Sequence, residues 1–162
     1  TSCTDKVRHF HATGRGGYDE QALLYRSEGF TEADSETLKK GGVTVKKYIY
    51  NMPELLAAAD IVICRAGAMT LSEIACMGKA SIIVPSPNVT NNHQYKNAKV
   101  LADAGAAVLI EEKDLTGQLL CEKVKYFVDN PEERKKMQDN VRKFAVMDAL
   151  DRIYSEICEL AD

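Results

Sequence analysis

Short apolar runs alternate with longer amphipathic segments from the start of the chain to about residue 110. Short apolar runs bounded by turn residues are typical of strands, and segments with apolar positions three and four residues apart are typical of helices. The predicted strands are 7–12, 43–48, 61–64, 80–84 and 106–110. The predicted helices are 18–28, 52–59, one beginning near residue 70, and 93–104.

Strands that alternate with helices in this way predict a parallel sheet with helices on both faces. The last third of the chain changes to three successive helical patterns, at 114–128, 131–144 and 148–160. We therefore expect an α/β fold, a doubly wound parallel sheet with a helical C-terminal tail, in which residues 1–162 form a single domain. The hydrophobic fraction of 45% is ordinary for a globular protein with a core of this kind.

The segment from Ile61 to Ala75 indicates an anion site. An apolar strand, Ile61 to Cys64, is followed by the small turn Arg65 to Ala68 and by a helix that we expect to begin near Thr70. The first N–H groups of a helix lack intrahelical acceptors, so a phosphate fits over Gly67 to Thr70.

The same residues have a second interpretation. Thr70-Leu-Ser-Glu73 also fits a capping box, in which Glu73 bonds back to the start of its own helix. Glu73 would otherwise accept hydrogen bonds from ribose hydroxyls. Spacing alone leaves both interpretations open, and Gly67 can be a plain tight turn.

Four segments, including the one just described, follow predicted strands, so we expect them to lie at one edge of the sheet, where ligands bind in this fold. These segments are 13–17, 48–52, 65–70 and 86–94.

Charge and ligand counts exclude several classes of function. The net charge of −3 offers no general attraction for nucleic acid, and no apolar run reaches the roughly 20 residues that span a bilayer. His9 and His11 share a strand face, but no third ligand is apparent, so no metal site is expected. The five cysteines are odd in number and widely spaced, which favours reduced thiols and a cytosolic protein.

Several motifs resemble the carboxyl-terminal half of the MurG family of GT-B glycosyltransferases. They are Ile49-Tyr-Asn-Met52, the stretch from Cys64 to Ala75, Val84-Pro-Ser-Pro87, His93-Gln-Tyr-Lys-Asn-Ala98 and Ala104-Gly-Ala-Ala107. The likeness keeps this order from His11 to Ile153. That half of the family binds the donor UDP-N-acetylglucosamine (UDP-GlcNAc).

The resemblance implies a role for each matching residue. Ile49 would offer its backbone to the uracil, with Tyr48 near the base and Met52 packed close by. From the residues alone, Met52 is more often a core residue, and Tyr48 can be a strand-end aromatic packed on its neighbours.

In the later motifs, Ala68, Met69 and Thr70 would meet the diphosphate or sugar through backbone N–H groups, and Glu73 would bind the ribose hydroxyls. Gln94 and Asn97, three apart on one helix, would bind the hydroxyls of the GlcNAc ring. Without the resemblance, these two residues would be expected to be ordinary solvent-facing side chains.

The family reaction implies the partners. It is an inverting transfer of GlcNAc to lipid I, undecaprenyl-diphosphate-MurNAc-pentapeptide, which forms lipid II for peptidoglycan synthesis and cell wall biogenesis, without a metal or cofactor. The chain begins after the family's first strand and glycine-rich turn, and that strand would lie between those near Val7 and Ile61. The acceptor half, with the catalytic base and the membrane contact, is also absent. We therefore expect this chain alone to bind UDP-GlcNAc weakly without transferring it, and the full protein to be peripheral on the cytoplasmic face of a bacterial membrane.

Two other functions remain open. The chain can be the donor subunit of a two-chain GlcNAc transferase, similar to the eukaryotic enzyme that elongates dolichol-linked GlcNAc, or a non-catalytic nucleotide-sugar-binding module. A dehydrogenase is disfavoured because no Gly-x-Gly-x-x-Gly turn follows a strand.

Overall fold

The computed structural model describes residues 7–161 and divides into two compact units, Thr1–Leu55 and Leu56–Asp162. Each unit is described by itself. The first holds β1 (His9–Ala12), α1 (Tyr18–Ser27), β2 (Thr31–Asp34), β3 (Thr37–Lys40) and β4 (Val43–Lys46), and α2 (Met52–Ala58) spans the boundary. The second holds β5 (Ile61–Cys64), α3 (Ala68–Met77), β6 (Ala80–Ile83), η1 (Thr90–Asn92), α4 (His93–Asp103), β7 (Val108–Leu109), η2 (Glu112–Asp114), α5 (Gly117–Asp129), α6 (Pro131–Arg142) and α7 (Ala149–Ala161).

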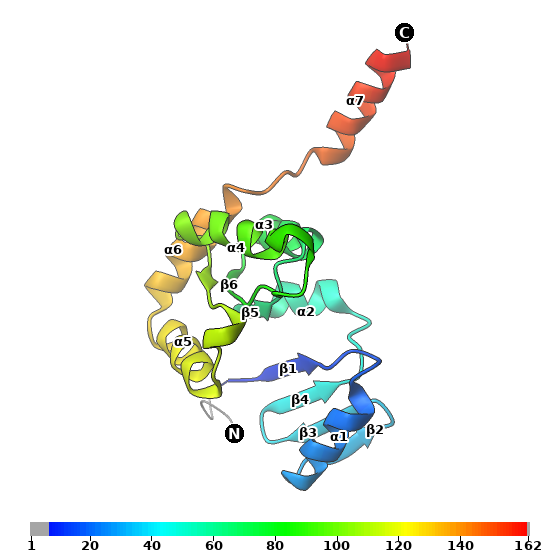
Figure 1. Ribbon diagram of the computed structural model, residues 1–162, viewed down its shortest axis with the longest axis vertical. Helices are drawn as coiled ribbons and strands as arrows, with labels where there is room; N and C mark the ends of the chain where they lie inside the picture. Colours follow the sequence, from blue (N-terminus) through cyan, green and yellow to red (C-terminus); the bar gives the residue numbers. More distant parts are fainter. Residues whose placement is uncertain (1–6, 162) are drawn as a thin grey trace. The chain divides into compact units, whose positions relative to one another are not determined.

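The first unit is a mixed four-stranded sheet in the order β1-β4-β3-β2. β1 and β4 are parallel, with His9 opposite Val43, and β3 pairs with both β4 and β2 in antiparallel fashion. α1 lies on this sheet (Figure 1) and contributes buried residues to its core. The fully buried members of this core are Tyr18, Ala22, Leu38 and Val45.

The antiparallel hairpin of β2 and β3 corrects the sequence prediction, which places no strand or helix between residues 28 and 43. Every residue of β2 is exposed, so no alternation of buried and exposed positions marks the strand. Its turn is held by the Asp34 carboxylate, which accepts from the Glu36 N–H at 2.8 Å. Strand pairing, rather than burial of β2 itself, forms this element.

The second unit has three layers around the parallel sheet β5-β6-β7. Figure 1 shows β5 and β6 between α3 and α4 on one side and α5 on the other. All four residues of β6 are buried. The core on the side of α3 and α4 includes Ile83 of β6, Ile74 of α3 and Leu101 of α4. The core on the side of α5 includes Ile82 of β6 and Val124 of α5. The predicted α/β fold with parallel strands and helices on both faces is thereby confirmed.

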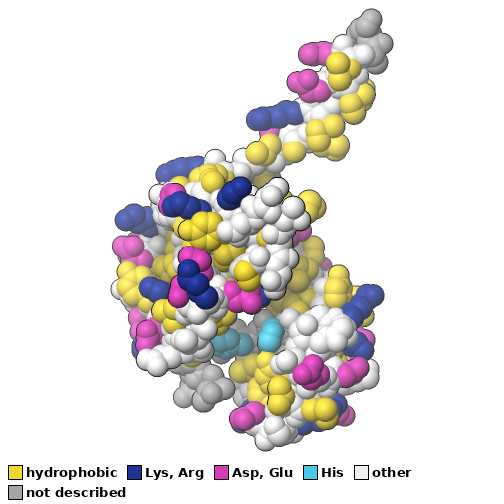
Figure 2. Space-filling model, viewed as in Figure 1, with side chains coloured by type: hydrophobic (Ala, Val, Ile, Leu, Met, Phe, Trp, Pro, Cys, Tyr) yellow, Lys and Arg dark blue, Asp and Glu magenta, His cyan; other side chains and the backbone are white. Residues whose placement is uncertain are grey.

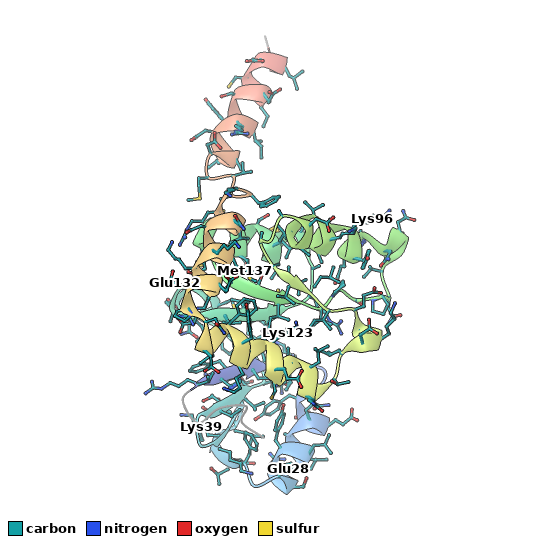
Figure 3. The ribbon with its side chains drawn as sticks, turned by 90° about the vertical axis from the view of Figure 1, so that its left-hand side faces the viewer. Glu28, Lys39, Lys96, Lys123, Glu132 and Met137 are labelled. Atoms are coloured by element: carbon teal, nitrogen blue, oxygen red, sulfur yellow. The ribbon has the colours of Figure 1, made fainter. Side chains whose placement is uncertain are left out.

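The helix α6 closes this core through Met137, which lies beside β6 in Figure 3. The sulfur of Met137 accepts from the Ser81 N–H at 3.4 Å, and the side chain packs with Ala80 and Phe127. The predicted helical tail therefore begins as part of the core.

The last helix, α7, keeps an apolar stripe exposed. Figure 2 shows its hydrophobic side chains at the surface. The exposed apolar residues of this stripe are Leu150, Ile153, Tyr154, Ile157 and Leu160. Along the described part of the chain, no helix combines the length and apolar character needed to cross a bilayer.

The cysteines differ from their predicted state at one position. Cys64, Cys76 and Cys158 are free thiols, as expected. Cys121 is disulfide-bonded, so the prediction of reduced cysteines is wrong for that residue. Cys3 lies outside the described residues.

Candidate functional site

The turn after β5 leads into α3 without a side-chain cap. The N-cap is Gly67, with φ −68° and ψ 139°, and α3 begins at Ala68, two residues before the predicted start. Thr70 thus lies inside the first turn and cannot be the N-cap, so the capping-box interpretation is wrong. The first intrahelical bond runs from the Leu71 N–H to the Gly67 oxygen at 3.0 Å.

The backbone at this helix start is suited to an anion. The N–H groups of Ala68, Met69 and Thr70 precede the first intrahelical donor, and the helix dipole adds partial positive charge there. Met69 is 77% exposed, so the turn is open to solvent. A Cβ added to Gly67 would meet only Thr70 Oγ1, at 3.9 Å, so glycine here keeps the approach open without being required by the fold.

Glu73 lies on α3 one turn after this start, and it is exposed. Because Thr70 is not the N-cap, Glu73 is not the capping-box residue of the helix. Its carboxylate is therefore open to solvent.

Gln94 and Asn97 are half-buried and each is anchored by one end of its carboxamide. The Gln94 Oε1 accepts from the Ser86 N–H at 2.9 Å, and the Asn97 Nδ2 donates to the Ala66 oxygen at 3.4 Å. Neither is therefore an ordinary solvent-facing residue. The anchoring leaves Gln94 with its NH₂ donors and Asn97 with its Oδ1 acceptor. A donor beside an acceptor suits neighbouring hydroxyl groups.

A hollow of about 550 Å³ lies at the segments that follow β6 and β7. It includes Ser86 but none of the predicted site residues. Its lining residues are Pro85, Ser86, Pro87, Asn92, Tyr95, Glu111, Glu112 and Lys113.

In the first unit, the segment after β4 presents an aromatic surface. Tyr48 is 45% exposed and packs edge-on against Tyr50, with ring centroids 5.0 Å apart. The Arg15 guanidinium carbon lies 4.9 Å from the centre of the Tyr48 ring. Ile49 is buried, and Met52 is 43% exposed, so the alternative of Met52 as a core residue is wrong.

The sequence predicts that four segments lie at one edge of a single sheet, whereas the structure places them at the strand ends of two separate sheets, two segments in each unit. β1 and β4 are parallel, so the segments after them lie at the same end of the sheet, joined by the Thr13 N–H to the Lys46 oxygen at 3.1 Å. β5 and β6 are parallel too. The predicted site residues thus form two groups. Tyr48, Ile49 and Met52 belong to the first unit, and Gly67, Ala68, Met69, Thr70, Glu73, Gln94 and Asn97 to the second.

Sequence reasoning missed the two arginines next to these groups. Arg15 lies over Tyr48, and Arg65 forms an ion pair with Glu112. Both occur in small-residue turns that directly follow a strand. A charged residue in such a turn was the signal that could have found them.

Cys64 on β5 and His11 on β1 have shifted pKa values. Burial raises the pKa of the Cys64 thiol to about 11, so this thiol is not a nucleophile at neutral pH. Burial also lowers the pKa of His11, whose Nδ1 lies 2.9 Å from the Tyr25 hydroxyl. Within the described residues, no group of three or more His, Cys, Asp or Glu side chains could hold a metal ion.

Comparison with known proteins identifies relatives of this arrangement. Residues 4–153 match the model of the glycosyltransferase family 28 C-terminal domain. A Thermoanaerobacter sp. (strain X514) protein is 53% identical over 145 residues, which are 90% of this chain and 38% of that protein. Its name is UDP-N-acetylglucosamine--N-acetylmuramyl-(pentapeptide) pyrophosphoryl-undecaprenol N-acetylglucosamine transferase.

A protein of the same name from Desulforudis audaxviator is 42% identical over 155 residues, 96% of this chain and 40% of that protein. Among solved structures, Acinetobacter baumannii MurG superimposes with a TM-score of 0.73 at 28% identity, covering 95% of this chain and 42% of that chain. This chain therefore spans about two fifths of the length of these relatives.

Proposed function

The chain belongs to the glycosyltransferase family 28 C-terminal domain family, and on that premise we propose that it is the donor-binding half of an inverting N-acetylglucosaminyltransferase. The donor is UDP-GlcNAc. The acceptor is lipid I, and the product is lipid II for peptidoglycan synthesis. This proposal is supported most by the uncapped start of α3 at Gly67, which offers backbone N–H groups to a diphosphate.

The diphosphate and nucleoside would be bound as follows. The N–H groups of Ala68, Met69 and Thr70 would contact the phosphates, and the Glu73 carboxylate would accept from the ribose hydroxyls. The Ile49 backbone would pair with the uracil, with Tyr48 beside the base and Met52 against it. Arg15 lies over Tyr48 and adds positive charge near that position.

The sugar would be bound by the two anchored carboxamides. The NH₂ of Gln94 would donate to one hydroxyl of GlcNAc, and the Oδ1 of Asn97 would accept from another. Both side chains are already held by the backbone at Ser86 and Ala66, so binding would order few additional bonds.

In the reaction, the acceptor hydroxyl of lipid I attacks the anomeric carbon as UDP departs. Negative charge grows on the β-phosphate, and the preorganised N–H groups at the start of α3 would stabilise it without a metal or cofactor. The acceptor site, the catalytic base and the membrane contact would come from the other half of the full protein, on the cytoplasmic face of the bacterial membrane.

We further propose that β5 receives another parallel strand. β5 is an edge strand of its sheet, and its Ile63 is 45% exposed. Edge N–H and C=O groups of an apolar strand favour strand addition. A peptide with the sequence of the family's first strand should protect the β5 amides from hydrogen exchange, and unchanged exchange would count against this pairing.

The proposed donor function is tested by calorimetric titration of the chain with UDP-GlcNAc, UDP and UDP-glucose. We expect saturable binding with UDP-GlcNAc the tightest ligand, and no GlcNAc transfer to a lipid I analogue. A folded chain that binds none of the three ligands would refute the donor function. GlcNAc transfer by the chain alone would refute the assignment of the acceptor site and the catalytic base to the other half of the full protein.

A further inference from the structure

One side chain joins the segments that follow all three strands of the second unit. The Arg65 Nη1 donates to the carbonyl oxygens of Val84 and Pro85, at 3.2 and 3.4 Å, and pairs with the Glu112 carboxylate. Arg65 follows β5, Val84 and Pro85 follow β6, and Glu112 lies after β7. A single guanidinium therefore links these segments at the edge where the candidate site lies.

The linked segments also form hydrogen bonds with the two α4 carboxamides that would bind the sugar. Ser86, the neighbour of Pro85, donates its N–H to Gln94. Ala66, the neighbour of Arg65, accepts from Asn97. A displacement of Arg65 would thus reach both carboxamides through adjacent peptide units.

We propose that Arg65 and Glu112 are positioning residues of the nucleotide-sugar site. Glu112 holds the Arg65 guanidinium against the Val84 and Pro85 carbonyls, and this contact fixes Ser86 and the orientation of the Gln94 carboxamide. The inference rests on the proposed function for its ligand.

The chemistry of the pair fits positioning better than a contribution to global stability. The side chains of Arg65 and Glu112 are 51% and 39% exposed, and exposed ion pairs contribute little to stability. All three contacts are made by Nη1, at the far end of the Arg65 side chain. The ammonium of a lysine stands one bond closer to the backbone, so Arg65→Lys should not keep all three contacts. The effect of losing the pair should therefore be local.

The adjacent Glu111 supplies a matched control. Its side chain is also 39% exposed, but it pairs with Lys113 at 3.0 Å and has no bond to Arg65 among the contacts of the described residues. Glu112→Gln and Glu111→Gln thus remove the same charge from neighbouring positions, and only Glu112→Gln releases Arg65.

The first readout needs no ligand. In amide NMR spectra of the 162-residue chain, Glu112→Gln and Arg65→Lys should shift the Ser86 N–H and the Gln94 NH₂ signals, and Glu111→Gln should leave them in place. Melting temperatures should change by no more than about 2 °C. Unchanged Ser86 and Gln94 signals in both Arg65→Lys and Glu112→Gln, or equal shifts in Glu111→Gln, would overturn the proposal.

The second readout separates positioning from general damage. Glu112→Gln should weaken UDP-GlcNAc binding about fivefold and UDP binding less than about twofold, because UDP lacks the sugar that Gln94 would contact. An equal loss for both ligands would contradict the proposal. If the wild-type chain binds neither ligand, the donor function fails, and the ligand-free spectra still decide whether Arg65 and Glu112 hold Ser86 and Gln94.

Discussion

The two units each contain a parallel strand, a glycine-containing turn with one arginine, and a helix, yet their turns present different chemistry. After β1, Arg15 lies over the exposed ring of Tyr48. After β5, Arg65 is bound by carbonyls and Glu112. Both helices begin after a glycine without a side-chain cap, but the first turn of α1 carries Asp19 and Glu20, whereas the first turn of α3 has no acidic residue. The loop after β1 therefore adjoins an exposed aromatic ring, and the loop after β5 adjoins a helix start without acidic side chains. The residues that surround such a loop, rather than its own glycine pattern, decide which chemical groups it presents.

The substitution with the largest expected effect is at Glu73, which lies on α3 after the loop that follows β5. Glu73→Ala removes a charged acceptor for two hydroxyls, so UDP and UDP-GlcNAc should both bind about tenfold or more weakly in calorimetry. Glu156→Ala on the exposed α7 is the control. Unchanged affinity in Glu73→Ala would remove this residue from the site.

A smaller effect is expected at Gly67. Its φ of −68° suits alanine, and an added Cβ meets nothing closer than 3.9 Å, so Gly67→Ala should cost less than about 1 kcal/mol of folding free energy. The methyl group should nevertheless crowd the diphosphate and weaken UDP about fivefold. Gly117→Ala, at the start of α5 with open space around it, is the control for titration and thermal melting.

The exposed rings of Tyr48 and Tyr50, which form the aromatic platform of the first unit, should contribute less. Tyr48→Ala removes a stacking surface, and UDP and UDP-GlcNAc affinities should fall together by about threefold to fivefold. Tyr126 is a matched control because it is 48% exposed, against 45% for Tyr48, and lies on α5. A loss in Tyr126→Ala as large as in Tyr48→Ala would show that the platform is not specific.

The smallest effect concerns pH and the first unit. Burial holds the pKa of folded His11 below its ordinary value of 6.5, so the unfolded chain takes up the proton more readily. The contribution of neutral His11 to stability is therefore fully present above about pH 7 and is lost as the pH drops through 6.5. Thermal melting between pH 7.5 and 5.5 should show this fall, and His11→Gln should reduce it. If the wild type became more stable on acidification and His11→Gln did not, the direction assigned to the His11 pKa shift would be wrong.

A comparison of β6 with β2 shows which strands could be predicted from the sequence. β6 was predicted because all its residues are buried and its sequence is a compact apolar run. β2 was missed because all its residues are exposed, and its strand character comes from pairing with β3. A local sequence pattern therefore predicts which residues are buried better than it predicts which strands pair.

For the site, backbone features could be predicted and long-range contacts could not. The Gly67 turn follows directly from a strand, small residues and a helix. The Arg65 to Glu112 contact joins residues 47 positions apart, and no local pattern links them. The anchored state of Gln94 and Asn97 likewise depends on the Ser86 and Ala66 backbone, which only the fold brings near.

The most direct test of the donor-binding account is Gln94→Glu. The new carboxylate can still accept from the Ser86 N–H, but it cannot donate to a sugar hydroxyl. Side-by-side calorimetric titrations at neutral pH should show unchanged affinity for UDP and a UDP-GlcNAc affinity reduced to that of UDP. Equal effects on the two ligands, or no effect on either, would contradict the assignment of this edge of the sheet to a nucleotide sugar.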